Sequence, residues 1–151
     1  MQKITPFLWF NDNAEEAMNF YVSVFKGAEI IHLMKLPGGK VLGGTFEING
    51  QEFKTLNGGP MYQFTPAISL FVNCETQEEL DELWNQLSAG GRESRCGWLE
   101  DKYGLSWQII PSSLGKYLSD PNPVKAKNTM QAMMAMGKII IKDLEEAYHK
   151  E

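Results

Sequence analysis

The 151-residue sequence is poor in the side chains that form disulfides or bind transition metals. Its only cysteines are Cys74 and Cys96, and its only histidines are His32 and His149. Two cysteines do not make the disulfide framework of a small secreted domain, and their spacing matches no zinc motif. We therefore predict a reduced, cytoplasmic protein without a cysteine-based zinc site.

The sequence also lacks long apolar runs and clusters of basic residues. No apolar run approaches the roughly 18 residues of a membrane-spanning helix, and residues 1–6 contain no signal-peptide core. The 14 basic residues are outnumbered by 19 acidic residues, and the net charge is −5. This charge disfavours binding to nucleic acids and anionic membranes. We predict neither kind of partner.

The remaining composition, 43% hydrophobic and 22% charged, is that of an ordinary globular protein. Its length suits one domain, or two small modules that share a core.

The same order of elements is predicted twice along the chain. In the first half, hydrophobic periodicity and turn residues indicate a strand at 4–10, a helix between Asn13 and Gly27, and strands at 29–36, 41–48 and 51–57. In the second half they indicate a strand at 67–73, a helix between Thr76 and Gly90, and strands at 93–96, 98–99 and 105–110. Such a duplication predicts two copies of one supersecondary unit.

Local signals support several of these elements. Thr76 and Glu79 have the spacing of a capping box at the start of the second helix. Asn49-Gly50 is the pair typical of a two-residue hairpin turn. In the last strand, alternation places Gln108 on the face opposite Trp107, so that a polar amide sits in mid-strand.

Four short motifs carry a resemblance to a known family. They are Phe20-Tyr21, Leu56-Asn57-Gly58-Gly59-Pro60, Cys96-Gly97-Trp98-Leu99 and Trp107-Gln108-Ile109-Ile110. With the duplicated element order, they make the chain resemble PhnB-like proteins, which carry the label 3-demethylubiquinone-9 3-methyltransferase domain. These proteins belong to the glyoxalase/bleomycin resistance/dioxygenase (vicinal oxygen chelate) superfamily. The resemblance covers about residues 3–112.

The resemblance implies an α+β fold, in which two βαβββ modules form a cupped mixed sheet around a ligand site, and a homodimer. We expect modules at 1–59 and 66–111 with a linker at 60–65, together one domain at 1–111. A C-terminal helical extension follows at 112–151, with a short helix at 112–119 and a long helix from about 124 to 149. The apolar face of the long helix contains Met130, Met133, Met134, Ile140, Ile141, Leu144 and Tyr148. Methionines at helical spacing are typical of core packing, and a dimer contact is the alternative.

The metal enzymes of this superfamily place their ligands on the first and last strand of each module. The corresponding positions lie near Thr5 or Pro6, at Asn57, near Ala67 and at Gln108. None is a carboxylate or an imidazole, and neutral amides bind transition metals weakly. We therefore predict no metal and no other cofactor. A displaced metal site that uses His32 and Glu47 is the alternative.

A pocket without a metal would be built from neutral polar groups among aromatic rings. The candidate ligand-binding residues are Phe7, Trp9, Asn57, Ser69, Cys96, Trp98 and Gln108. Such a lining suits a small, flat, partly apolar molecule, although core packing is the alternative for each aromatic residue. Cys96 has no neighbouring base in the sequence, so a packed thiol is favoured over a nucleophile. Glu100, Asp101 and Lys102 are predicted to form a solvated turn.

The leading hypothesis is therefore a binding protein for a small molecule, with an unknown reaction. One alternative is a lyase, isomerase or dioxygenase with a displaced metal, and another is the methyltransferase of the family label. The glycine pairs 38–39, 43–44 and 58–59 lie between predicted strands, whereas a typical S-adenosylmethionine site needs a glycine-rich turn before a helix. A protein that sequesters a cationic drug is a further alternative.

Overall fold

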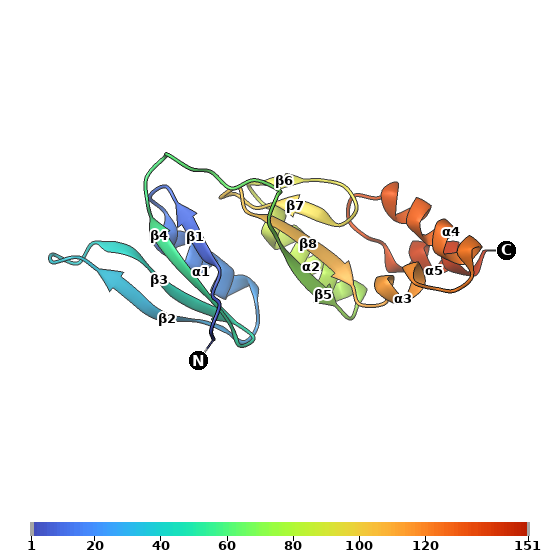
Figure 1. Cartoon of the computed structure of the whole chain (residues 1–151), viewed down its shortest axis with the longest axis horizontal. Coiled ribbons are helices and arrows are strands. Elements are labelled where there is room, and N and C mark those ends of the chain that lie inside the picture. The colour runs from blue at the N-terminus through green and yellow to red at the C-terminus, as the bar shows by residue number, and fades with distance from the viewer. Residues whose placement is uncertain (1, 151) are drawn as a thin grey trace. The chain divides into compact units, whose positions relative to one another are not determined.

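The computed structural model describes residues 2–150, and the chain divides into two compact units, Met1–Phe64 and Thr65–Glu151. Each unit contains a four-stranded mixed sheet, and one helix covers a face of it (Figure 1). The predicted α+β fold with two βαβββ modules is confirmed. The outer bounds of the predicted domains, at 1 and 151, lie outside the described residues, and the linker bounds stay a prediction.

The first unit consists of one βαβββ module. Its elements are β1 (Phe7–Phe10), α1 (Ala14–Val24), β2 (Ala28–Lys35), β3 (Val41–Ile48) and β4 (Gln51–Asn57). The sheet order is β1-β4-β3-β2, with β1 parallel to β4 and the other pairs antiparallel. Asn49 and Gly50 both have positive φ, 48° and 87°, as the hairpin turn between β3 and β4 requires.

The second unit repeats this module and adds three helices. Its elements are β5 (Ser69–Cys74), α2 (Gln77–Ser88), β6 (Arg92–Glu93), β7 (Trp98–Glu100), β8 (Ser106–Pro111), α3 (Leu114–Leu118), α4 (Pro123–Met134) and α5 (Ile141–His149). The sheet order is β5-β8-β7-β6, which is the order of the first sheet. The N–H of Glu79 donates to the Thr76 hydroxyl over 3.2 Å, so the predicted N-cap of α2 is present.

The core of each unit lies between its helix and its sheet. In the first unit, Tyr21 of α1 stacks on Phe46, which stacks on Phe53 with ring centroids 5.1 Å apart. In the second unit, Leu80 and Trp84 of α2 are buried with Trp107 of β8. Because each helix covers only one sheet face, the opposite face of each sheet is left for other contacts.

The C-terminal extension differs from its prediction. The long helix expected from 124 to 149 is wrong, because α4 ends at Met134 and α5 begins at Ile141. Tyr148 of α5 stacks on Tyr117 of α3 and donates a 2.5 Å hydrogen bond to Asp120. This bond lowers the pKa of Asp120 and raises the pKa of Tyr148.

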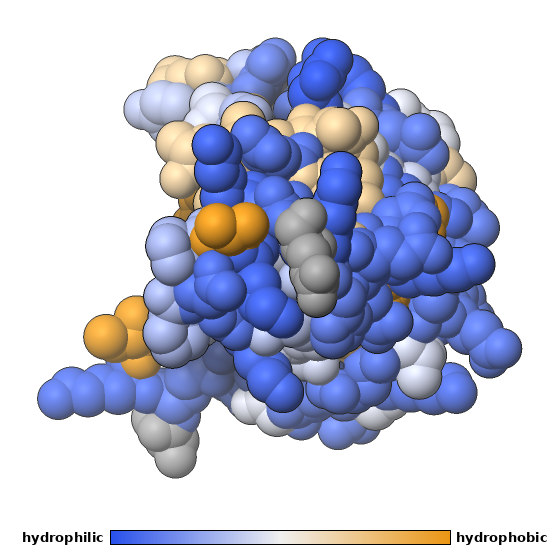
Figure 2. Space-filling view, turned by 90° about the vertical axis from the view of Figure 1, so that its right-hand side faces the viewer, coloured by the Kyte–Doolittle hydropathy of each residue, from blue (hydrophilic) through white to orange (hydrophobic). Residues whose placement is uncertain are grey.

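The expected core packing of the methionines is wrong for two of them. Met130 and Met134 of α4 are 41% and 58% exposed. Figure 2 faces the end of the molecule that carries these helices, and its hydrophobic residues form small, separate groups among hydrophilic ones. Among the described residues, no helix is long and apolar enough to cross a membrane.

Candidate functional site

Candidate site residues lie on two open faces, one in each unit. An open face is the face of a sheet opposite its helix. In the first unit, strand register places Phe7, Lys54, Thr45 and His32 side by side across the four strands. These four residues line a cavity of about 170 Å³, together with Met34, Gly44 and Thr55. Phe7 is 57% exposed, so this face offers an accessible ring beside an amine and an imidazole.

Trp9 shares the strand with Phe7 and is covered by the segment that follows β4. Its indole Nε1 donates to the Gly59 carbonyl over 2.9 Å, and its ring meets Tyr62 edge to face at 5.1 Å. A Cβ on Gly58 would lie 2.3 Å from the Trp9 ring. The glycine at 58 therefore lets the backbone pack directly on the indole.

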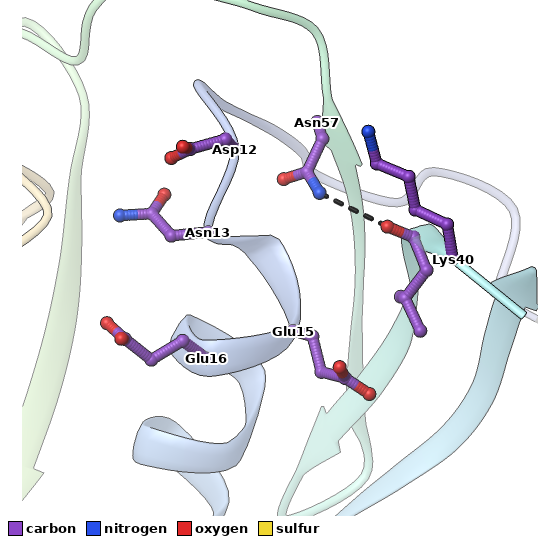
Figure 3. A pocket seen from close by; sticks show the side chains of 7 residues that line it. Asp12, Asn13, Glu15, Glu16, Lys40 and Asn57 are labelled. Carbon is purple, nitrogen blue, oxygen red and sulfur yellow. Dashed lines mark hydrogen bonds between the residues drawn. The ribbon is translucent and has the colours of Figure 1, made fainter.

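The side chain of Asn57 lies on the side of the first sheet that α1 covers. Its Oδ1 accepts a 2.8 Å hydrogen bond from the Ala14 N–H, and its Nδ2 donates to the Val41 carbonyl over 3.3 Å (Figure 3). Residues 53, 55 and 57 point to the same side of β4, so Asn57 shares the face of the buried Phe53 and Thr55 and lies opposite the face of Trp9. As a ligand-binding residue, Asn57 stays a prediction.

A wide hollow of about 600 Å³ surrounds Asn57 at the start of α1. Asp12, Glu15 and Glu16 line it with Lys40. Figure 3 shows the carboxylates of Glu15 and Glu16 pointing to different sides of the helix. The acidic side chains do not converge on one point, so they do not form a cation cage.

On the open face of the second unit, Gln108 of β8 lies in register between Phe71 of β5 and Trp98 of β7. The amide Nε2 of Gln108 donates to the Ser69 hydroxyl over 2.9 Å. Three of the predicted residues, Ser69, Trp98 and Gln108, therefore come together. Phe71, 55% exposed, was not predicted. Phe71 lies two residues after Ser69 on β5, so strand periodicity places both side chains on the same face. This periodicity is the sequence signal that indicates Phe71.

Ser106 precedes this group by two residues and lies in register with Ser69. It is 1% exposed, and its hydroxyl has no hydrogen-bond partner within residues 2–150. Buried hydroxyls nearly always have partners. The hydroxyl is shielded from solvent, so Ser106 belongs to the packed part of this face rather than to its accessible part.

Cys96 lies in the turn between β6 and β7, although the sequence predicted a strand up to this residue. Its φ is +59°, in the left-handed region that side chains other than glycine seldom adopt. The thiol is half-buried. Its contact with a ligand stays a prediction.

The predicted solvated turn at 100–102 is wrong for Asp101, which is 2% exposed. Its Oδ1 accepts from the N–H groups of Tyr103 and Leu105, at 2.8 and 3.1 Å. Its Oδ2 accepts from the indole of Trp107 at 2.9 Å. The carboxylate therefore fixes the β7–β8 hairpin and the strand that carries Gln108.

The donor groups on these faces do not fit a transition metal. Among the described residues, no group of three or more His, Cys, Asp or Glu side chains could hold a metal ion. His32 pairs with Thr45, whereas Glu47 pairs with Glu29, so the two residues of the displaced-site hypothesis occupy different rows of the sheet. The amides of Asn57 and Gln108 already bind Ala14 and Ser69.

The glycine pairs do not fit a nucleotide cofactor of the S-adenosylmethionine type. Gly38 and Gly39 lie between β2 and β3, Gly43 and Gly44 lie inside β3, and Gly58 and Gly59 follow β4. None of these pairs directly precedes a helix. The phosphate- and ribose-binding arrangement of strand, glycine-rich turn and helix is therefore missing from the described part of the chain.

Comparisons with known proteins place this chain in a family. Residues 2–110 match the family model described as 3-demethylubiquinone-9 3-methyltransferase. The solved structure of a PhnB protein from Bacillus cereus is 41% identical, covers 74% of this chain and 100% of its own, and has a TM-score of 0.69. A Pseudomonas aeruginosa protein is 18% identical over 73% of this chain and 96% of its own, with a TM-score of 0.58. No curated protein matches the sequence.

Proposed function

Because the chain belongs to the family described as 3-demethylubiquinone-9 3-methyltransferase, we propose that it is a member of the glyoxalase/bleomycin resistance/dioxygenase superfamily and that it binds a small, partly apolar molecule on an open face of one of its sheets. The binding needs none of the superfamily's usual metal ligands. One observation carries the proposal: the Gln108 amide lies between an exposed Phe71 and a half-buried Trp98.

The chemistry of this group favours a flat, neutral ligand. Phe71 and Trp98 offer ring surface that a planar molecule can cover, and aromatic contacts of this kind add stability beyond the area buried. The Nε2 of Gln108 donates a hydrogen bond to Ser69, whereas its Oε1 accepts none from the described part of the chain. A ligand N–H or O–H can therefore bind to Oε1, and a few such polar groups orient ligands in mostly apolar sites.

The open face of the first unit offers a second surface. Its cavity of about 170 Å³ is smaller than the roughly 300–1,000 Å³ of pockets that hold drug-sized ligands. Phe7 and Met34 supply apolar area there, and Lys54 and His32 supply groups that bind anions. This surface suits a fragment or one end of a larger molecule.

The proposal is tested with benzamide as a flat amide probe and cyclohexanecarboxamide as its non-aromatic match. We expect benzamide to raise the melting temperature by mass action, and cyclohexanecarboxamide to raise it less. Gln108→Leu should weaken benzamide binding about three- to tenfold in calorimetry, because one hydrogen bond is lost. Gln86→Leu on α2 is the control and should bind as the natural chain does.

Two results would contradict the proposal. The first is an unchanged benzamide affinity in Gln108→Leu. The second is stabilisation by a cationic glycopeptide such as bleomycin, with none by benzamide, which would favour a drug-sequestering protein.

We also propose that the chain forms a homodimer, as the resemblance implied, and that it works in the cytoplasm. Light scattering on the full chain should give twice the monomer mass of 17.1 kDa at micromolar concentration. A mass of one chain across the whole concentration range would contradict the dimer.

A further inference from the structure

The segment between α4 and α5 binds the turn that leads into Trp98. We call residues 136–141, which include the first residue of α5, the clamp segment. The N–H of Cys96 donates to the Met136 carbonyl over 2.8 Å, and the N–H of Gly97 donates to the Gly137 carbonyl over 2.9 Å. The C-terminal extension thus supplies the hydrogen-bond partners of two consecutive backbone amides in the candidate site.

The turn needs this support because its backbone is strained. Cys96 has a φ of +59°, and a residue in this conformation persists only where the surrounding structure holds it. Gly97 follows with a φ of +82°. A Cβ at this position would lie 2.6 Å from Ile110 and 3.2 Å from Ile139 of the clamp segment. The turn is therefore packed between β8 and the clamp segment.

Gln77, in the first turn of α2, holds the clamp segment by its side chain. Its Nε2 donates to the Ile139 carbonyl over 3.0 Å, and its Oε1 accepts from the Ile141 N–H at 2.7 Å. The same Nε2 donates to Asp81 over 2.8 Å. One side chain thus satisfies a carbonyl and an N–H on either side of Ile140.

An ion pair to α2 and a buried side chain further fasten the clamp segment. Ile139 is completely buried, and the Lys138 ammonium lies 2.9 Å from the Asp81 carboxylate. Hydrogen bonds from Gln77 and Lys138 hold the pKa of Asp81 below its usual value. The polar contacts surround a buried apolar side chain, which is the arrangement of a firm attachment rather than of a loose tail.

The turn transmits this attachment to the site. The Ser94 N–H donates to the Trp98 carbonyl over 2.9 Å, and the Trp98 N–H donates to the Arg95 carbonyl over 3.0 Å. The Gly97 carbonyl accepts from the Ile109 N–H at 2.7 Å, beside Gln108. The position of the Trp98 ring against Gln108 therefore depends on the conformation of this turn.

We propose that Gln77 and the clamp segment are positioning elements, which hold the strained turn at Cys96 and so set Trp98 against Gln108. The family match covers residues 2–110, so Gln77 lies within it and the clamp segment lies beyond it. The hold on the turn is independent of any ligand, whereas its consequence for binding rests on the proposed function.

The two cysteines provide the test. Cys96 is half-buried and next to the clamp contacts, whereas Cys74 is fully buried in the same unit. Burial, with the nearby Glu79 and Glu75 carboxylates, raises the pKa of the Cys74 thiol to about 12. Alkylation by iodoacetamide, followed by mass spectrometry of each cysteine, therefore separates local opening of the turn from unfolding of the unit.

In Gln77→Leu, we expect Cys96 to be alkylated about tenfold faster, because several hydrogen bonds are lost, while Cys74 stays unreactive. Hydrogen exchange at the Cys96 and Gly97 amides should rise with it. Ile139→Ala should act in the same direction. The control is Gln86→Leu on the same helix, whose side chain makes a single 3.3 Å hydrogen bond to Glu82.

An unchanged rate at Cys96, or a parallel rise at Cys74, would overturn the proposed hold on the turn. Weaker benzamide binding in Gln77→Leu than in Gln86→Leu would support the positioning of Trp98, and equal binding would overturn it. If the natural chain does not bind benzamide, the proposed function fails, and the alkylation rates still decide whether the clamp holds the turn.

Discussion

Replacing Asp101 by alanine is expected to lower the free energy of unfolding by about 3 kcal/mol or more. The carboxylate is buried and accepts hydrogen bonds from two backbone N–H groups and from the Trp107 indole. Alanine would leave these donors without this acceptor in the core, and a buried donor without a partner costs roughly 1–3 kcal/mol. Urea denaturation followed by circular dichroism measures the loss.

Asp101→Asn gives a graded comparison. The asparagine oxygen can still accept from the Tyr103 and Leu105 amides, but its NH₂ group would face the Trp107 indole N–H. We expect a smaller loss of about 1–2 kcal/mol. Asp143→Ala, at an exposed position of α5, should change stability by no more than about 0.5 kcal/mol. Equal stabilities of the alanine variants at 101 and 143 would show that the buried carboxylate contributes nothing.

The second large effect is expected at Gly43, in the middle of β3. A Cβ there would lie 2.1 Å from the Thr55 carbonyl oxygen and 2.9 Å from the Leu56 Cα. These atoms belong to the backbone of the neighbouring strand and cannot rotate away. Gly43→Ala should therefore separate β3 from β4 locally and lower the free energy of unfolding by about 3 kcal/mol. Urea denaturation and the amide exchange of β4 measure this.

The matched control for Gly43 is Gly115→Ala in α3. An added Cβ there meets nothing within 4 Å, and alanine has a higher helix propensity than glycine. We expect an unchanged or slightly higher stability, by up to about 1 kcal/mol. A Gly43→Ala chain as stable as Gly115→Ala would mean that β3 and β4 do not pack as closely as described.

Local signals predicted most of the fold. The Asn49-Gly50 turn, the Thr76 cap and the alternating strands depend on residues close in sequence, and the structure contains all of them. The prediction of one long C-terminal helix was wrong because the break in this helix depends on residues far apart in sequence. Its break at residues 135–140 provides carbonyls to the Cys96 and Gly97 amides, a long-range contact that helical periodicity does not reveal.

The candidate site was predictable only in part. Alternation correctly places Gln108 on the face opposite the buried Trp107, whereas the family resemblance that suggests Asn57 carries no information about the face that Asn57 occupies. Asn57 lies two residues after Thr55 on β4, so strand periodicity already places its side chain on the sheet face that α1 covers. The burial of Asp101 was not predicted because a charged residue in a glycine-ended turn usually lies in water, and the local sequence does not reveal its hydrogen bond from the Trp107 indole.

The double role of Asn57 limits what an engineer could install at this position. A glutamate at 57 could still accept from the Ala14 N–H, but it would bring a negative oxygen against the Val41 carbonyl, which now receives a proton donor. A histidine could not satisfy both partners with the geometry of the amide. Installing a metal ligand at this position would therefore require a redesigned start of α1 as well as further ligands.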